Sequence, residues 1–180
     1  MKYLLTIIGI VAAMGLGGML FTWSGLYDIA ATEPHWDATV SLINTLRDRS
    51  IAVHSRGIQA PNLDDPQYRR AAVGHYHGMC RLCHGAPGAH TNEFAEGLYP
   101  SPPDLTSGAV RNIRSAAEMY WIVKHGIKMT GMPAFGPTHD EKELWGLVAL
   151  ARALPGMSAE AYAGETDQHS ETSDTGHSHA

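Results

Sequence analysis

The sequence predicts an all-α domain with long loops, preceded by one apolar N-terminal helix and followed by an acidic tail. Three observations favour this fold class. No strand-like alternation of apolar and polar residues occurs between residues 60 and 156. Two patterns of a hydroxyl residue followed three positions later by Glu, beginning at Ser115 and Thr138, are typical of helix starts. An uncharged run over residues 3–27 is long enough for a helix that crosses a bilayer.

The apolar run is predicted to be a retained membrane anchor, residues 1–27. Its 25 uncharged residues would form a helix of about 37 Å, which exceeds the ~30 Å hydrocarbon thickness of a bilayer. Trp23 and Tyr27 stand near its end, where amphipathic rings meet a membrane interface. The alternative is a signal peptide cut near Ala30-Ala31, but the apolar core of such a peptide spans only ~7–15 residues.

Charges on either side of the span predict its orientation. Lys2 precedes it and Asp28 follows it, which favours a cytoplasmic N-terminus and places the rest of the chain on the outer side. Residues 28–61 are expected to connect the anchor to the main domain. Residues 37–54 within them have the pattern of an amphipathic helix, which could pack on the domain or dock on a membrane partner. Its apolar residues are expected on one face: Val40, Ile43, Leu46 and Ile51.

The main domain is expected over residues 62–156. Asp65-Pro66 is a typical helix start, with a capping carboxylate followed by a proline in the first turn. Gly126 and Pro155-Gly156 are typical stop signals for the two helices after it. The predicted helices are residues 66–80, 115–125 and 138–154, with a long loop rich in Gly and Pro over residues 85–108.

The tail, residues 157–180, is expected to be disordered. It holds five acidic residues and no Lys or Arg, so its own charge of -5 equals the net charge of the whole chain. The remainder is close to neutral, so a basic nucleic-acid surface is not indicated. The tail is too poor in apolar residues to fold alone. It carries three histidines that could bind Cu or Zn: His169, His177 and His179.

The only two cysteines, Cys80 and Cys83, are separated by two residues and point to a haem. A thioredoxin-like pair would need a βαβ context, and a zinc half-site would need a second pair of ligands. His84 follows the second cysteine directly, as c-type haem attachment requires. Both thiols would then form thioethers with the vinyl groups of one haem, and His84 would be the proximal axial ligand.

A haem also needs an apolar cradle and a sixth ligand. The cradle candidates are aromatic residues: Tyr76, Tyr99, Trp121, Phe135 and Trp145. Met129 and Met132 lie between the two capped helices, and Pro133 fixes the backbone after Met132. Two strong protein ligands indicate electron transfer, whereas an open iron site indicates ligand binding or catalysis. A second histidine is a further alternative, with five candidates: His75, His77, His90, His125 and His139.

These motifs together resemble class I c-type cytochromes over roughly residues 62–155. The similarity is greatest to the single-haem domains of cbb3-type oxidase subunits and related membrane-bound carriers. Residues 76–85 resemble the family's first helix and haem motif, and Pro103-Asp104-Leu105 resembles its Pro-x-Leu element. Residues 131–135 resemble its Met-Pro-Ala ligand loop. Trp145 resembles the aromatic residue of the last helix, which crosses the first helix near a glycine, here Gly74.

The resemblance implies one haem c with His84 and Met132 as its axial pair. It also implies that the Pro103 carbonyl holds the His84 ring, although the adjacent Pro102 makes that assignment ambiguous. Met129 is a second methionine near the ligand loop and a departure from the family pattern. The family's haem is attached on the outer side of the bacterial inner membrane. We therefore expect a single-pass protein with a periplasmic haem domain and redox proteins, oxidase subunits among them, as partners.

The predicted function is one-electron transfer, as a tethered carrier or as the cytochrome subunit of a redox complex. One alternative is a haem enzyme or gas sensor with an open iron site, for which His125 near the methionine loop is the suggestive group. Another is a metal-handling or assembly protein that uses the histidines of the tail. No paired carboxylates, nucleophile–base pair or phosphate-binding loop in the sequence indicate an independent enzyme.

Overall fold

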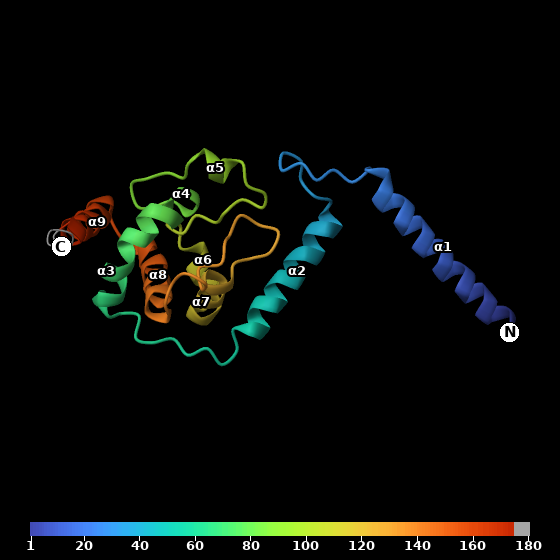
Figure 1. Ribbon diagram of the computed structural model, residues 1–180, viewed down its shortest axis with the longest axis horizontal. Coiled ribbons are helices and arrows are strands. Elements are labelled where there is room, and N and C mark those ends of the chain that lie inside the picture. The colour runs from blue at the N-terminus through green and yellow to red at the C-terminus, as the bar shows by residue number, and fades with distance from the viewer. Residues whose placement is uncertain (175–180) are drawn as a thin grey trace, which may run out of the picture. The chain divides into compact units, whose positions relative to one another are not determined.

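The computed structural model describes the backbone of residues 1–174 and the side chains of residues 1–167. The chain divides into two compact units, Met1–Val40 and Ser41–Ala180. The described residues are helical and contain no strand, which confirms the predicted all-α class (Figure 1).

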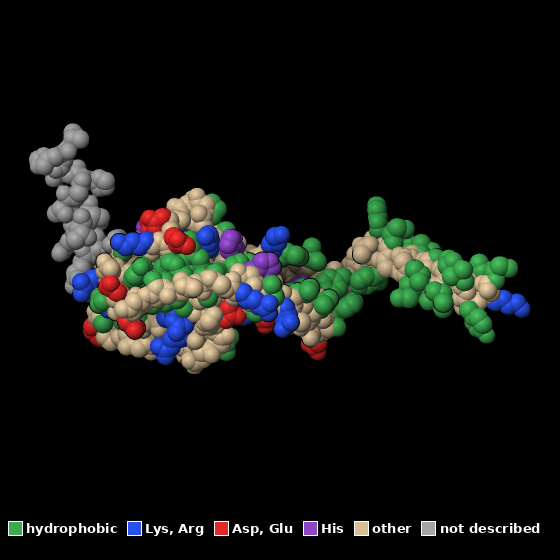
Figure 2. Space-filling model, turned by 90° about the horizontal axis from the view of Figure 1, so that it is seen from below, with side chains coloured by type: hydrophobic (Ala, Val, Ile, Leu, Met, Phe, Trp, Pro, Cys, Tyr) green, Lys and Arg blue, Asp and Glu red, His purple; other side chains and the backbone are tan. Residues whose placement is uncertain are grey.

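The first unit is dominated by α1, Lys2–Ser24, which has no buried residue. Hydrophobic side chains cover its visible surface, and a basic side chain stands at its free end (Figure 2). The helix ends where Gly25 adopts the left-handed conformation, with φ 66°. Its mean hydropathy reaches 2.3 over 18 residues, so length and composition allow it to cross a membrane.

Helix α2 has the predicted bounds, Asp37–His54, but the prediction of a single apolar face was wrong. Ile51 is only 2% exposed, whereas Ile43 and Leu46 are 45% and 61% exposed. Val40 and Ile51 are about three turns apart and therefore share a face, while Leu46 lies well around the helix from both.

The helix that carries the two cysteines begins as predicted and runs further. Asp65 caps α3, Pro66–His75, by accepting a hydrogen bond from the Gln67 amide at 3.0 Å. The helical run continues through a π-helical segment, η1, Tyr76–Cys80, and then α4, Arg81–His84. The prediction ended this helix at Cys80, so the run is four residues longer than expected. A π-helical turn inside an α-helix is rare and is often found at functional sites.

The two capped helices are present, and one capping box was misplaced. Ser115 and Glu118 form the predicted box at the start of α7, Ala116–His125. At α8, Glu141–Ala153, the box consists of Asp140 and Glu143, and the prediction of Thr138 with Glu141 was wrong. The Asp140 carboxylate accepts from the Glu143 amide at 2.9 Å. A charged cap interacts more favourably with the helix dipole than the Thr138 hydroxyl would.

Helix α8 is the centre of the second unit, and α3 and α7 pack against it (Figure 1). A β-carbon on Gly146 would lie 2.8 Å from the Tyr68 carbonyl oxygen and 3.1 Å from the Ala72 β-carbon, so only glycine allows this close crossing of α3 and α8. The resemblance pointed to Gly74 of α3 as the crossing glycine. Gly146 of α8, beside Trp145, makes a close approach at this crossing, and the role of Gly74 stays a prediction.

The loop after the cysteine motif contains little regular structure. It holds one short helix, α5, Glu93–Glu96, and one isolated β-bridge between Ala86 and Ala89. A second short helix, α6, Ala109–Ile113, leads from the loop to α7. After α8 the chain makes one 3₁₀ turn, η2, Leu154–Gly156.

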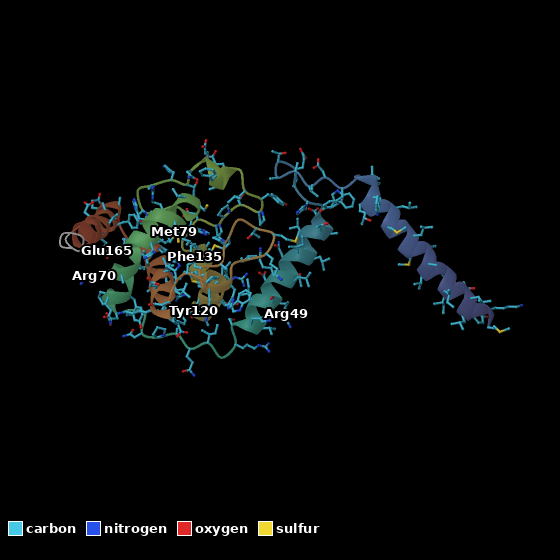
Figure 3. All side chains as sticks on the ribbon, in the orientation of Figure 1. Arg49, Arg70, Met79, Tyr120, Phe135 and Glu165 are labelled. Carbon is cyan, nitrogen blue, oxygen red and sulfur yellow. The ribbon has the colours of Figure 1, made fainter. Side chains whose placement is uncertain are left out.

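The tail is not disordered throughout, contrary to the prediction. Its backbone forms α9, Ala159–Asp174, and this helix packs against α3. Tyr162 is 4% exposed and belongs to the core, and the Arg69 guanidinium lies 3.0 Å from the Glu165 carboxylate. The tail folds because it packs on the domain, which supplies the apolar surface that the tail lacks. Figure 3 labels Glu165 on this helix. The side chain of His169, and the whole of His177 and His179, lie outside the described residues.

Candidate functional site

Cys80 and Cys83 lie at the C-terminal end of the helical run that begins at Pro66. Both are free thiols and half-buried. Burial, with a smaller effect from neighbouring Cys83, raises the pKa of Cys80 to about 12. Reactive thiolates instead have lowered pKa values and favour helix N-termini. The environment of Cys80 is therefore unlike that of a redox-active thioredoxin-type cysteine.

The Pro103–Leu105 segment holds His84 at two points. The His84 ring Nδ1 donates to the Pro103 carbonyl oxygen at 2.8 Å, and the Leu105 amide donates to the His84 carbonyl oxygen at 3.1 Å. Since a carbonyl oxygen only accepts, Nδ1 carries the proton and Nε2 keeps a free lone pair in the neutral ring. Of the two adjacent prolines, Pro103 supplies this carbonyl.

The surroundings of His84 favour the neutral form of its imidazole. Burial lowers its pKa, and the hydrogen bond to Pro103 only partly opposes this effect. A neutral, oriented imidazole with one nitrogen hydrogen-bonded to a carbonyl is the form in which histidine coordinates a metal.

Two further hydrogen bonds fix the C-terminal end of the helical run that carries the two cysteines. The Tyr76 hydroxyl donates to the Gly85 carbonyl at 2.7 Å, and the Asn92 amide donates to the Leu82 carbonyl at 3.0 Å. Tyr76 is 1% exposed, and burial raises its pKa well above the usual value. Tyr76 and Cys80 pack in the same core cluster. The backbone on both sides of His84 is thus tied to the domain.

The methionine loop, residues 126–135, is closed by a threonine that the sequence interpretation did not single out. The Thr130 hydroxyl donates to the Ile127 carbonyl at 2.8 Å and accepts from the Met132 amide at 3.1 Å. The Ile127 amide also donates to the Met132 carbonyl at 3.1 Å. Met132 is half-buried at the base of this turn, whereas Met129, with φ 59°, is 95% exposed at its tip. The two methionines therefore differ sharply in environment.

The far side of the methionine loop packs closely on the domain. The Phe135 amide donates to the Val123 carbonyl at 3.0 Å, and its ring packs in the core cluster of α7 and α8. Figure 3 labels Phe135 on this segment. A β-carbon on Gly131 would overlap the Leu98 side chain at 2.7 Å, so Leu98 packs directly against the loop at this glycine. Thr130 and Leu98 carry no motif, and only the three-dimensional packing identifies them.

The predicted cradle residues differ in their surroundings: three lie in or against the core clusters, and two lie elsewhere. Tyr76, Phe135 and Trp145 lie in or against the core clusters, and Trp145 stacks on Tyr120 with ring centroids 4.2 Å apart. Trp121 instead contacts His54 of α2 and His125 of its own helix, at ring-centroid distances of 5.7 and 5.2 Å. Tyr99 lies half-buried in the long loop.

Four of the alternative histidine ligands have partners elsewhere in the domain, and the fifth lies exposed in the long loop. His75 and His139 face each other with ring nitrogens 3.3 Å apart. His77 lies 3.3 Å from the Tyr162 hydroxyl, and His125 is an exposed neighbour of Trp121. His90 is the exposed loop residue.

The donor set fits a haem c. The half-buried thiols of Cys80 and Cys83 lie about one helical turn before His84 and directly before it, and the His84 Nε2 is available. The half-buried thioether of Met132 lies on a separate closed loop. Two large apolar side chains near these segments are left exposed, as expected where a large apolar group would cover them: Met79 40% and Phe94 68%. Figure 3 labels Met79 on the π-helical turn. Among the described residues, no group of three or more His, Cys, Asp or Glu side chains could hold a metal ion.

Comparison with known protein families supports this assignment. Residues 67–150, somewhat less than half of the chain, match the family model described as cytochrome c oxidase, cbb3-type, subunit III. Comparisons with curated proteins and with solved structures gave no match. The matched segment contains the cysteine motif, the Pro103 segment and the methionine loop. The match makes residues 67–150 similar to the cytochrome c domain of cbb3-type cytochrome c oxidase subunit III, a family that implies haem c and electron transfer, and the helical architecture agrees with this similarity.

Proposed function

We propose that the protein transfers electrons one at a time through a single haem c, bound covalently by Cys80 and Cys83, with His84 and Met132 as axial ligands. When bound, the haem iron supplies the one-electron chemistry, and the protein sets its potential and access. The observation that carries the proposal is the 2.8 Å hydrogen bond from His84 Nδ1 to the Pro103 carbonyl.

This hydrogen bond gives His84 a defined role. It fixes the ring orientation and tautomer, so that Nε2 faces away from Pro103 with its lone pair free. The bond from the Leu105 amide to the His84 carbonyl fixes the backbone as well. A ligand held in this way needs little rearrangement when the iron changes its charge, which favours electron transfer.

Met132 is the sixth ligand in this proposal because its position is fixed and Met129 is exposed. Thr130 and Ile127 hold the Met132 backbone, whereas the Met129 side chain is 95% exposed. A methionine opposite a histidine raises the reduction potential of haem. Two strong ligands also leave no open iron site, so this arrangement disfavours the enzyme and gas-sensor alternatives.

We further propose that α1 stays in the bacterial inner membrane and holds the haem domain on the periplasmic side. The support is the length and hydropathy of α1, with Lys2 before it and Asp28 after it. The partners in this proposal are membrane redox proteins, and oxidase subunits are the class that the family match suggests.

The mass of the purified protein and its reaction with carbon monoxide test this function together. The wild type should be heavier than its polypeptide by one haem under denaturing conditions, and Cys80→Ala with Cys83→Ala should lose that covalent mass. Reduced wild type should not bind carbon monoxide rapidly at neutral pH, because Met132 fills the sixth position. Absence of covalent haem would overturn the proposal. Covalent haem with rapid carbon monoxide binding would overturn only the ligand pair.

A further inference from the structure

An aromatic cluster joins the start of α2 to the end of the apolar helix α1. The Trp36 ring lies 5.9 Å from the Phe21 ring of α1 and 4.9 Å from the Tyr27 ring, between ring centroids. The Tyr27 hydroxyl also lies 3.0 Å from His35 Nδ1. These contacts all fall within the first unit of the chain. Trp36 directly precedes α2, so the linker returns to the end of α1 before α2 begins.

The exposed side of α2 carries a cluster of aliphatic side chains that the described structure does not cover. Leu42 and Leu46 are each 61% exposed and Ile43 is 45% exposed. On the other side of the helix, Ile51 is buried, and the Asp48 carboxylate accepts a hydrogen bond from Arg114. The helix therefore has two apolar sides, and only one of them packs on its own domain.

The exposed residues Leu42, Ile43 and Leu46, here called the α2 outer face, lie close in sequence to the aromatic cluster. Leu42 is about 9 Å and Leu46 about 15 Å beyond Trp36 along the helix axis. The interfacial layer on each side of a bilayer is roughly 5–7 Å thick, and amphipathic helices at a membrane surface bury their apolar side about 5–10 Å deep. A helix that begins at the end of a membrane span and lies along the bilayer surface can place this face among the lipid headgroups.

We propose that the α2 outer face binds the lipid bilayer surface beside the membrane anchor. Trp, Tyr and Phe at the junction are residues that favour the membrane interface, and the outer face offers aliphatic side chains for the acyl boundary. Arg49, exposed near this face in the second half of α2, would meet lipid phosphates (Figure 3). This inference rests on the proposed retention of α1 in the membrane.

The consequence is a haem domain held near the membrane instead of one that swings on a free linker. The predicted domain begins at residue 62, only eight residues after the end of α2 at His54. Such a domain exchanges electrons most readily with redox centres of proteins in the same membrane. The α2 outer face would thus favour fixed membrane partners over diffusing carriers.

Spin labels on the full-length, haem-loaded protein test this inference. Cysteine introduced by Leu46→Cys would be the only free thiol, because thioether formation uses Cys80 and Cys83. Thr45→Cys is the matched control, since Thr45 is exposed and adjacent but points about 100° around the helix. Each labelled protein is placed in phosphatidylcholine–phosphatidylglycerol vesicles, and its accessibility to oxygen and to a water-soluble nickel chelate is measured.

The label at residue 46 should give an oxygen-to-nickel accessibility ratio several-fold above that at residue 45. Equal exposure of both labels to the nickel chelate would overturn the inference. In native membranes, shielding of residue 46 from both reagents would also overturn it, because a protein partner would then cover the face. Two controls are measured separately. Retention of the protein in vesicles after high-salt washing tests the membrane anchor, and the covalent haem mass tests the haem proposal. Failure of either is therefore distinguishable from failure of surface binding.

Discussion

At the scale of single residues, the site is defined by hydrogen bonds that fix backbone and ring orientation. His84 is tied through Nδ1 to Pro103 and through its carbonyl to Leu105. Met132 is tied through its amide to Thr130. These constraints fix the His84 ring and the Met132 backbone before haem binds, which reduces the entropy lost on binding.

The two methionines of the loop are expected to behave differently. Met132→Ala should abolish the methionine–iron charge-transfer band at the red end of the visible spectrum and lower the reduction potential, because a thioether ligand raises it. Met129→Ala should leave both unchanged, since Met129 is 95% exposed. Spectra of the two oxidised variants provide the measurement. Loss of the band in Met129→Ala and its retention in Met132→Ala would reverse the assignment.

His77 is expected to make stability depend on pH. Burial, with a smaller effect from Arg81, lowers the pKa of His77 in the folded state. Its neutral form therefore contributes stability above the unfolded pKa of about 6.5. That contribution is lost as the pH falls through this value and through the lowered folded pKa.

The His77→Gln variant isolates this effect, because Gln does not titrate. The denaturant midpoint of the wild type should fall more between pH 7 and pH 5 than that of the variant. Parallel pH profiles for the two proteins would contradict the assignment of the titrating group to His77.

At the scale of secondary-structure elements, the helical run from Pro66 to His84 is held on two sides. Helix α8 crosses it closely at Gly146, and α9 packs on it through Tyr162 and Glu165. The run bears the proposed haem cysteines and ligand, so stable packing of α8 and α9 supports the site.

The start of α8 should depend on Asp140 and hardly on Thr138. Asp140→Ala removes the carboxylate that caps the Glu143 amide at 2.9 Å, which should cost about 1 kcal/mol of unfolding free energy. Thr138→Ala is the matched control and should cost clearly less, because Thr138 is not the cap of α8. Denaturant unfolding of both variants gives the comparison. An equal or larger loss for Thr138→Ala would restore the sequence-based capping box.

Helix α9 should contribute to stability through Tyr162. Tyr162→Ala should cost about 3 kcal/mol, the usual loss for a buried aromatic side chain, since the ring is 4% exposed. Tyr162→Phe keeps the ring and removes only the contact with His77, so it should cost about 1 kcal/mol or less. The unfolding free energies of the two variants test this. An unchanged value for Tyr162→Ala would show that the tail does not pack on the domain.

At the scale of the whole molecule, local signals in the sequence predicted most of the helices, and packing determined the rest. Asp65-Pro66, Ser115 and Gly126 act through contacts within a few residues, so their helix boundaries could be read from the sequence. The folding of α9 depends on the surface of α3, and the role of Gly146 depends on how α3 and α8 cross. No local pattern contains that information.

The contrast between local sequence signals and three-dimensional packing also applies to the site. The spacing of Cys80, Cys83 and His84 indicates a haem because attachment chemistry is local in sequence. The choice of Pro103 over Pro102, and the contrast between Met132 and Met129, became visible only through hydrogen bonds and exposure. Thr130 was missed because a hydroxyl that closes a loop has no distinctive sequence neighbourhood.

The most direct test of the central claim is a potentiometric titration of the purified full-length protein, followed by its visible spectrum. The proposal predicts one reversible transition with the slope of a one-electron Nernst curve, and a methionine–iron charge-transfer band that is present only in the oxidised state. A protein without a haem transition in this titration, or one with a high-spin oxidised spectrum that lacks the band, would contradict electron transfer through a haem ligated by His84 and Met132.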